Sequence, residues 1–330
     1  MNWKKITMSG ILVTSSLCFT VSALASSNST STRETSSANS VEVGWSTSSD
    51  FNTALAKPNW ISFIKNDNIK LSELSIPGTH DSLDLHGKTL FDKLYTQTQS
   101  WILSKQLQAG IRYIDVRVRR TGTTFAIHHG SVYQKQMFGD VLNDVANFLR
   151  QYPSETILMR VKEEYDAEKG SQFFEEIFNH YWNNYKSYFW NPTSNNPALG
   201  ELRGKIVVLQ NFTSNQQYGI SYNKLNTQDD YDVTNLDSKW SAVKAQFDKA
   251  SNDKSQIYLK HLSGTHYNLI NGNTPEDVAK NINTKAMSYM PSIKHSGIVV
   301  ADFPSTSLLP GIMLLNPLEG YYLDKPSYRE

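Results

Sequence analysis

The sequence has almost no cysteine and no excess of either charge. Its one cysteine, Cys18, lies near the N-terminus, and lysines plus arginines number 32 against 31 aspartates plus glutamates. A single cysteine excludes an internal disulfide framework and a cysteine-based zinc site. Nucleic-acid-binding domains usually carry a basic excess, so the balanced charge predicts no nucleic-acid partner.

Long hydrophobic runs are missing as well, apart from one near the N-terminus. There, Lys4 and Lys5 precede an apolar stretch at 11–19, and the small residues Ala23 and Ala25 follow it. This order is typical of a secretion signal. The stretch is too short and too rich in serine and threonine to span a bilayer. We therefore expect a signal peptide at 1–25 and a secreted, extracellular protein whose stability comes from a packed core.

Large apolar residues are scarce in the next segment too. Residues 26–56 consist mainly of serine, threonine, asparagine and alanine, a composition that buries too little apolar surface to fold. We interpret this segment as a disordered Ser/Thr-rich linker. Residues 57–330 show no internal repeat and no second linker, so we expect one catalytic domain there, and a monomer.

Strands alternate with helices along this domain. The predicted strands are 71–76, 111–119, 124–128, 156–162, 205–210, 257–261 and 297–301; the predicted helices are 136–150, 172–185, 238–250 and 274–290. Such alternation predicts a parallel sheet. The number of strands in about 270 residues favours an α/β fold, a single irregular TIM-type (β/α) barrel. Thr121 and Gly122 indicate a turn that joins two strands directly, so we expect at least one barrel helix to be missing.

One predicted strand carries charged side chains on a single face. In 111–119, Asp115, Arg117 and Arg119 alternate with isoleucine and valine, and alternate residues of a strand point to opposite faces. Charges inside a barrel need a wet cavity or partners. This pattern therefore predicts either a polar site or an internal ion pair that holds the barrel together.

Polar residues also follow several strands at the point where each strand ends. They are His80 and Asp81, His128 and His129, Lys162 and Glu164, and Asp302. In barrel enzymes, functional side chains gather where strands end, at the carboxyl-terminal mouth. Two histidines, several carboxylates and an arginine supply a general base, a general acid and a fixed cation. These groups suffice to break a phosphodiester without a metal.

Other interpretations of the same residues are open at this point. His80 and Asp81 could form a turn and a helix cap, and either His128 or His129 could belong to the core. A metal site is the rival for the cluster, although the sequence has no HExxH motif and Arg117 would repel a bound cation. The remaining histidines lack comparable surroundings and are interpreted as structural: His86, His180, His261, His266 and His295.

Taken in order, the motifs form a pattern found in a known family. They are SIPGTHDS at 75–82, DVR at 115–117, HHG at 128–130, KEEY at 162–165, LRGKIVVL at 202–209, QDDY at 228–231 and GIVVAD at 297–302. The domain resembles the secreted phosphatidylinositol-specific phospholipases C of Gram-positive bacteria. The resemblance implies a distorted barrel and a reaction without metal or other cofactor. The inositol 2-hydroxyl attacks phosphorus, diacylglycerol leaves and inositol 1,2-cyclic phosphate forms.

The resemblance also implies roles for individual residues. The catalytic set contains a general base, a general acid and a phosphate-binding arginine, each with a carboxylate partner. In that order the pairs are His80 and Asp302, His129 and Asp81, and Arg117 and Asp115. The implied inositol-binding residues are Lys162, Asp229 and Tyr231, with Glu164 in support. Tyr95 and Tyr267 match a rim that contacts the membrane, where phosphatidylinositol is the implied partner.

One position departs from the family's pattern. Relatives often place a second inositol-contacting arginine directly after the 202–209 strand, where this chain has Asn211. A neutral amide bonds to a hydroxyl but brings no charge, so the departure bears on cleavage of glycosylphosphatidylinositol (GPI)-anchored proteins more than on that of plain phosphatidylinositol. Two alternatives from other classes are a metal-dependent barrel phosphodiesterase and a non-catalytic protein that binds inositol lipid or glycan.

Overall fold

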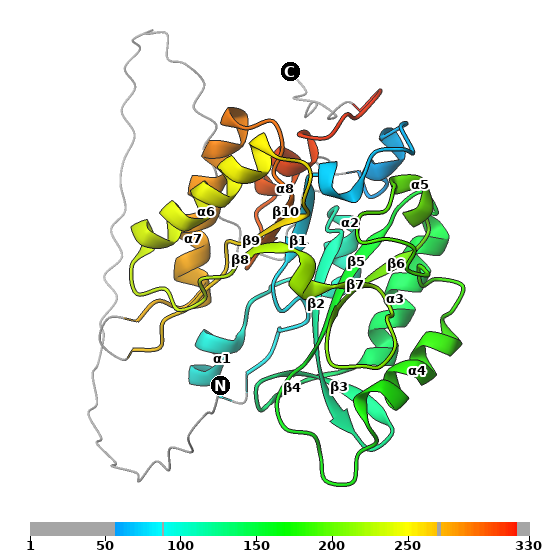
Figure 1. Cartoon of the computed structure of the whole chain (residues 1–330). Helices are drawn as coiled ribbons and strands as arrows, with labels where there is room; N and C mark the ends of the chain where they lie inside the picture. Colours follow the sequence, from blue (N-terminus) through cyan, green and yellow to red (C-terminus); the bar gives the residue numbers. More distant parts are fainter. Residues whose placement is uncertain (1–56, 88, 269–271, 322–330) are drawn as a thin grey trace, which may run out of the picture. The chain divides into compact units, whose positions relative to one another are not determined.

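The computed structural model describes residues 57–87, 89–268 and 272–321, of which 90–92 are described by backbone alone (Figure 1). The predicted signal peptide and linker at 1–56 lie outside these residues and stay predictions. None of the helices in the described ranges is long and apolar enough to cross a bilayer.

A curled parallel sheet forms the centre of the domain (Figure 1). Within the described residues, eight parallel strands form its main path, and β3 (Thr124–His129) and β4 (Val132–Met137) lie off it. Taken in chain order, each of the eight pairs with the next, with one exception, and the last pairs with the first. These strands are β1 (Ile76–Thr79), β2 (Tyr113–Thr121), β5 (Ile157–Glu163), β6 (Ile206–Asn211), β7 (Ile220–Ser221), β8 (Asn226–Gln228), β9 (Tyr258–His261) and β10 (Ile298–Ala301). The exception is an open seam, because among the described residues no ladder joins β7 to β8. The expected irregular barrel is confirmed.

A hairpin extends the sheet beyond the carboxyl end of β2. The strand β3 pairs antiparallel with β2, and β4 pairs antiparallel with β3. The predicted turn at 121–122 is confirmed. The helix expected to be missing here is present, since α3 (Phe138–Gln151) follows the hairpin. In the described part of the chain, the connections without an α-helix are instead those on either side of β7.

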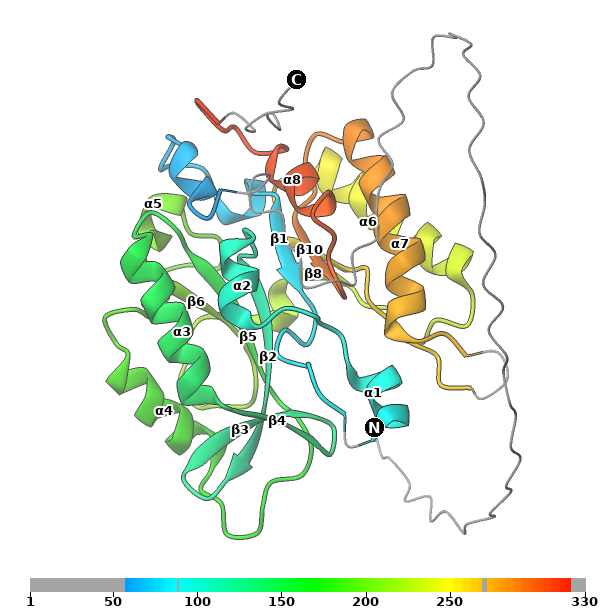
Figure 2. The ribbon, with the colours of Figure 1, turned by 180° about the vertical axis from the view of Figure 1, so that it is seen from behind.

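Helices cover the outer faces of the sheet. Helices α3 and α4 lie over the part that contains β2, β5 and β6, while α6 and α7 lie side by side over the part that contains β8 to β10 (Figure 2). The remaining bounds are α1 (Leu90–Thr96), α2 (Leu103–Gln108), α4 (Phe174–Asn184), α5 (Leu199–Leu202), α6 (Leu236–Asn252), α7 (Pro275–Tyr289) and α8 (Leu308–Met313). Helix α7 starts as its sequence predicts: Thr274 caps it by accepting a hydrogen bond from the Asp277 N–H.

The longer elements are the ones that the sequence predicts. The predicted first strand, 71–76, is wrong in its position, because 71–73 form a 3-10 helix and β1 begins only at Ile76. The sequence analysis also missed β4, β7, β8, α1, α2, α5 and α8. These elements are short, and a short segment carries little hydrophobic periodicity from which to identify it.

A buried ion pair ties the N-terminal segment to the amino-terminal end of the barrel. Arg112, just before β2, donates from Nε to Glu155 at 2.8 Å, and both side chains are fully buried. Glu155 also accepts hydrogen bonds from the N–H groups of Ile61 and Ser62 at 3.3 and 3.1 Å. One carboxylate therefore joins three separate segments of the chain.

Replacing Arg112 tests how much the fold depends on this pair. Arg112→Met leaves Glu155 buried without its cation, so we expect the free energy of unfolding to fall by about 3–5 kcal/mol. Urea denaturation measures the change. Arg150→Met, at an exposed arginine in the last turn of α3, is the matched control and should change stability by less than about 0.5 kcal/mol. Equal effects of the two substitutions would contradict the assignment.

Candidate active site

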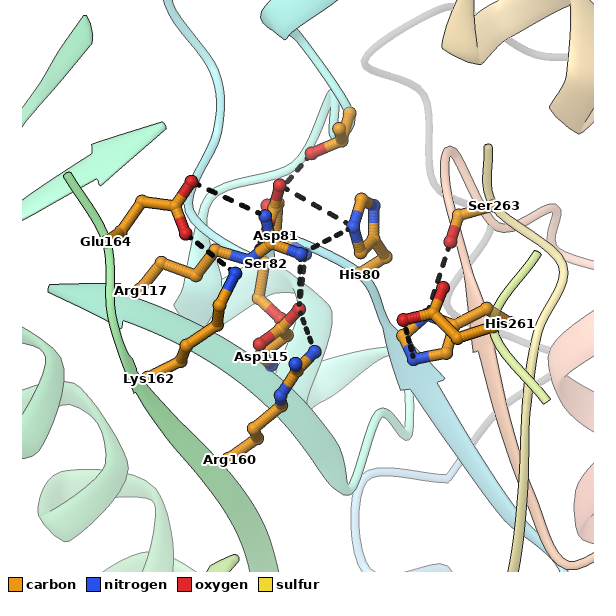
Figure 3. Close-up of polar contacts among 12 residues, drawn as sticks. His80, Asp81, Ser82, Asp115, Arg117, Arg160, Lys162, Glu164, His261 and Ser263 are labelled. Atoms are coloured by element: carbon orange, nitrogen blue, oxygen red, sulfur yellow. Dashed lines mark hydrogen bonds and ion pairs between the residues drawn. The ribbon is translucent and has the colours of Figure 1, made fainter. Parts of the chain in front are cut away.

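Parallel register brings polar side chains of neighbouring strands level with one another. Arg117 on β2 is level with Lys162 on β5, which is level with Asn211 on β6. Two residues earlier on these strands, Asp115 is level with Arg160. The isoleucine and valines between the charged residues of β2 are fully buried on the other face. The predicted charged face of β2 is therefore confirmed for Asp115 and Arg117, which point into the barrel (Figure 3), while Arg119 pairs with Glu168 at 3.4 Å.

The turn after β1 is fixed against β2. The Ser82 N–H donates to the carbonyl of Asp115 at 3.0 Å, and the Asp115 N–H donates to Ser82 Oγ at 2.8 Å. Gly78 allows the close approach of β1 to β2, since a Cβ there would lie 2.8 Å from the side chain of Tyr113, the first residue of β2. Asp81 has a left-handed φ of +38°, which the surrounding contacts must hold in place. The directions of the His80 and Asp81 side chains follow from this turn.

His80 lies between a carboxylate and a guanidinium. Its Nδ1 is 2.9 Å from Asp302 Oδ1, and its Nε2 is 2.9 Å from a terminal nitrogen of Arg117. Because Arg117 can only donate, Nε2 must accept and the ring proton lies on Nδ1, toward Asp302. Burial alone would lower the pKa of His80, but Asp81 and Asp302 outweigh burial and raise it. The predicted pairing of His80 with Asp302 is present.

Arg117 is the cation at the centre of the site. Its Nε pairs with Asp81 Oδ1, and its other nitrogens lie 3.4 Å from Asp115 Oδ2 and 3.8 Å from Glu164 Oε1. Burial alone would lower the pKa of Arg117, but these carboxylates raise it well above its usual value. Asp115 is also paired with Arg160, at 3.2 Å. Burial alone would raise the pKa of Asp115, and the two arginines lower it.

His129 reaches the site from the opposite direction to the other residues. The sequence analysis placed it at the end of a barrel strand, but β3 is antiparallel and returns its carboxyl end to the mouth. His129 Nδ1 lies 2.7 Å from Asp84 Oδ2 and 3.0 Å from the carbonyl oxygen of Thr96. The expected partner, Asp81, lies farther away, at 3.8 Å. His128 is buried and packs against Tyr133 of the hairpin instead.

The two histidines face the same small region. His80 Nε2 and His129 Nδ1 lie 3.6 and 3.8 Å from one oxygen, Oδ2 of Asp81. Both side chains are partly exposed, at 18% and 24%, while that of Asp81 is buried. Both rings therefore lie beside the same buried carboxylate, and solvent reaches each of them. The predicted base, acid and arginine are brought together.

The predicted headgroup residues divide into a close group and a more distant one. Lys162 Nζ donates to Glu164 at 3.0 Å, which places the amine and carboxylate beside Arg117 (Figure 3). Asp229 Oδ2 lies 3.9 Å from Nε2 of His261, and Figure 3 shows His261 on the side of His80 away from Arg117. Tyr231 is 62% exposed on the loop after β8. Arg117, Lys162 and Glu164 thus lie together, and Asp229 and Tyr231 come from the segment directly after β8.

Three residues of the site were missed or given no role from the sequence. Asp84 contacts His129, as described above. Arg160 donates to Asn211 Oδ1 at 3.0 and 2.8 Å, and its guanidinium lies 4.2 Å from the ring centre of Tyr222. His261, interpreted as structural, is fully buried with its ring centre 5.6 Å from that of His80. The RVK alternation at 160–162 was the available signal for Arg160, because it puts two cations on one strand face.

The two tyrosines predicted for the membrane rim contact each other. The rings of Tyr95, on α1, and Tyr267, after β9, have centres 4.9 Å apart at an interplanar angle of 61°. Tyr267 is 59% exposed, and Leu94, which precedes Tyr95 on α1, is 52% exposed. Two segments far apart in the sequence thus form one exposed aromatic and apolar edge.

The donor set also has to be tested for a metal. In the described ranges, two groups of side chains have ligand atoms close enough for an ion: His80, Asp81 and Asp115, and Asp81, Asp84 and His129. Arg117 pairs with Asp81 and Asp115, so the carboxylates of the first group already face a fixed cation. We assign no metal to this site.

Comparison with known proteins places these features in a family. Residues 74–212 match the family Phosphatidylinositol-specific phospholipase C, X domain. The 1-phosphatidylinositol phosphodiesterase of Listeria monocytogenes serovar 1/2a is 31% identical over 278 residues, 78% of this chain and 84% of the relative. The protein of the same name from Staphylococcus aureus strain Newman is 33% identical over 251 residues, 67% and 80% of the two chains.

Solved structures agree with the sequence relatives. A double mutant of the phosphatidylinositol-specific phospholipase C from S. aureus is 28% identical, with a TM-score of 0.71 over 81% of this chain and 99% of that one. The enzyme from L. monocytogenes is 29% identical, with a TM-score of 0.69 over 79% and 99%. The chain therefore belongs to the bacterial phosphatidylinositol-specific phospholipases C.

Proposed function

We propose that the protein cleaves phosphatidylinositol to diacylglycerol and inositol 1,2-cyclic phosphate, without a metal. The observation that carries this proposal is the convergence of His80, His129 and Arg117 on Asp81. A base and an acid then stand on either side of a fixed cation, within one opening of the barrel. The relatives named 1-phosphatidylinositol phosphodiesterase support the substrate class.

The proposed reaction needs two proton transfers and no outside nucleophile. The 2-hydroxyl oxygen of inositol bonds to phosphorus while its proton passes to His80 Nε2. The bond from phosphorus to the glyceride oxygen breaks, and that oxygen takes a proton from His129 Nε2. Because the nucleophile belongs to the substrate, its effective concentration is very high. The protein has only to move protons and balance charge.

Arg117 links substrate binding to activation of the base. Without substrate, one of its N–H groups donates to His80 Nε2, the atom that must accept the hydroxyl proton. A phosphate is a stronger acceptor for a guanidinium than a neutral imidazole is. We propose that Arg117 releases His80 Nε2 when phosphate oxygens bind it. The 2-hydroxyl of the substrate then donates to Nε2 in place of Arg117.

The ring hydroxyls of inositol have partners on both sides of the mouth. We assign them to Lys162 with Glu164, to Asp229 and to Tyr231. The neutral Asn211 does not leave its side of the site without charge, because the Arg160 guanidinium donates two hydrogen bonds to its Oδ1. This arrangement supports binding of plain phosphatidylinositol.

GPI-anchored proteins are a second proposed substrate class. A cavity of about 440 Å³ opens beside Asn211, and its lining contains amides and hydroxyls but no ionisable side chain. Such a surface suits neutral sugars linked to inositol. Release of a GPI-anchored reporter from cells tests this proposal, and its absence alongside cleavage of plain phosphatidylinositol would refute it.

Phosphorus NMR of phosphatidylinositol vesicles in EDTA tests the central proposal. We expect a cyclic phosphate signal and released diacylglycerol from the wild type, and nearly complete loss of both in His80→Ala and His129→Ala. Turnover that EDTA abolishes would favour the metal-dependent alternative. Vesicle binding without any product would favour the non-catalytic one.

We also propose an extracellular location. It is checked by finding a protein that lacks residues 1–25 in the culture medium.

The pH dependence of turnover should follow the two histidines. Base catalysis needs neutral His80, so kcat/KM should fall as pH drops through its raised pKa, above 6.5. Asp302→Asn removes one of the carboxylates that raise this pKa, so the acid limb should move to lower pH. A profile of kcat/KM against pH, on a monomeric short-chain substrate, measures the limb. A limb that stays in place or moves upward would contradict the role of Asp302.

The tyrosine edge should matter only at a membrane. Tyr95→Ser or Tyr267→Ser removes apolar surface that we propose enters the headgroup region of the bilayer, where the polar tip of tyrosine is tolerated. We expect cleavage of vesicles to fall severalfold while cleavage of a monomeric short-chain substrate is unchanged. Exposed Tyr133→Ser, on β4, is the control. Equal losses on both substrates would remove the pair from the membrane surface.

A further inference from the structure

The carboxylates of the site are divided between the two histidines in a way that the motifs do not show. His80 has Asp302 at 2.9 Å, and His129 has Asp84 at 2.7 Å. Asp81 lies between them, with one oxygen paired to Arg117 and the other 3.6 and 3.8 Å from the two rings. Each imidazole therefore has a near carboxylate of its own, and the shared one is bound to the arginine.

We propose that Asp84 is the positioning residue for His129, holding its ring and its positive charge, while Asp81 serves chiefly to fix Arg117. The inference rests on the proposed acid role of His129 for its meaning in turnover. The contact itself is a property of the free protein.

The backbone around Asp84 makes it a rigid acceptor. Its N–H donates to the carbonyl of Asp81 at 3.0 Å, which closes a turn directly after the catalytic motif. Its own carbonyl accepts from the N–H groups of Thr98 and Gln99 at 3.1 and 3.3 Å. The side chain is only 3% exposed. Asp84 thus joins the turn after β1 to the segment after α1, and its carboxylate cannot turn toward water.

The contacts of His129 distinguish orientation from charge. Its Nδ1 donates a hydrogen bond to the carbonyl of Thr96 and forms an ion pair with Asp84 Oδ2 at 2.7 Å, so the ring proton stays on Nδ1 when the Asp84 carboxylate is removed. The transferable proton then lies on Nε2, for which the described residues show no hydrogen-bond partner. Only Asp84 brings a full negative charge to hydrogen-bond distance, so its particular effect is to stabilise the imidazolium.

Both carboxylates and an arginine act on the pKa of His129. Burial lowers its pKa, and Arg117 lowers it further, but Asp84 and Asp81 outweigh both and raise it to about 10. Burial and Asp81 raise the pKa of Asp84 to about 7, against the lowering effects of His129 and Arg117. Glu164 and Asp302 also interact electrostatically with His129. The acid is therefore held in its protonated form across neutral pH.

Titration of His129 by NMR in the free protein tests this proposal without turnover. In Asp84→Asn we expect its pKa to fall by at least about one unit, a tenfold weaker hold on the proton. Asp84→Glu, which restores the carboxylate, should recover much of the shift. Asp232→Asn is the matched control, because Asp232 contacts His266 at the same 2.7 Å but is 63% exposed. That control should leave the titration of His129 and turnover unchanged.

Activity against pH separates a charge effect from general damage. In Asp84→Asn, turnover of a monomeric substrate relative to wild type should be kept at pH 6 and fall at pH 9, by about twofold for a pKa lowered by one unit and about tenfold for one lowered by two units, because more of His129 has lost its proton. A uniform loss at every pH, or an unshifted His129, would overturn the proposal. If the variant does not fold, the wild type decides: a His129 pKa at or below 6.5 overturns it, and a clearly raised one supports it.

Loss of all turnover in the wild type, with a raised His129 pKa that depends on Asp84, would instead refute the proposed function and leave the pair standing.

Discussion

The ion pair between Asp81 and Arg117 is the constraint on which the site depends. A guanidinium with 14% of its side chain exposed is costly unless carboxylates surround it, and Asp81, Asp115 and Glu164 do so from three separate elements. The same carboxylates set the charge of the histidines. Moving Arg117 would therefore change the ionisation of the base and the acid as well as phosphate binding.

This balance explains the left-handed backbone at Asp81. The motif must turn sharply enough to put a histidine and an aspartate, adjacent in sequence, on the two sides of one arginine. The Ser82 contacts with Asp115 and the close approach at Gly78 hold that turn against β2. The strain of one residue thus lies where three catalytic groups meet, and the parallel ladder from β10 to β5 supports it from both sides.

Much of the site could be predicted because its residues lie in short sequence patterns. The alternation of β2 identifies Asp115 and Arg117, and the strand ends identify His80 and Asp302. Asp84 could not be found this way, since its partner His129 lies 45 residues farther along the chain and only the fold brings them together. The direction of β3, in contrast, could have been predicted, because a tight turn that joins two strands directly makes them antiparallel.

Arg160 shows the same limit for a different reason. Seen in sequence, Asn211 looks like the loss of a positive charge. In the fold, the level register of β5 and β6 lets an arginine on the neighbouring strand reach that amide. The positive charge that the family pattern places at position 211 can therefore come from a residue on a neighbouring strand, here Arg160 on β5.

The position of the open seam between β7 and β8 affects which strands of the sheet are held on both sides. Along the hydrogen-bonded path, β1 and β2 stand in the middle and the seam strands at the two ends. His80, directly after β1, and Arg117, on β2, are therefore anchored where the ladder is continuous on both sides and farthest along the path from the seam. A break placed there interrupts the ladder without interrupting the strands that carry those residues.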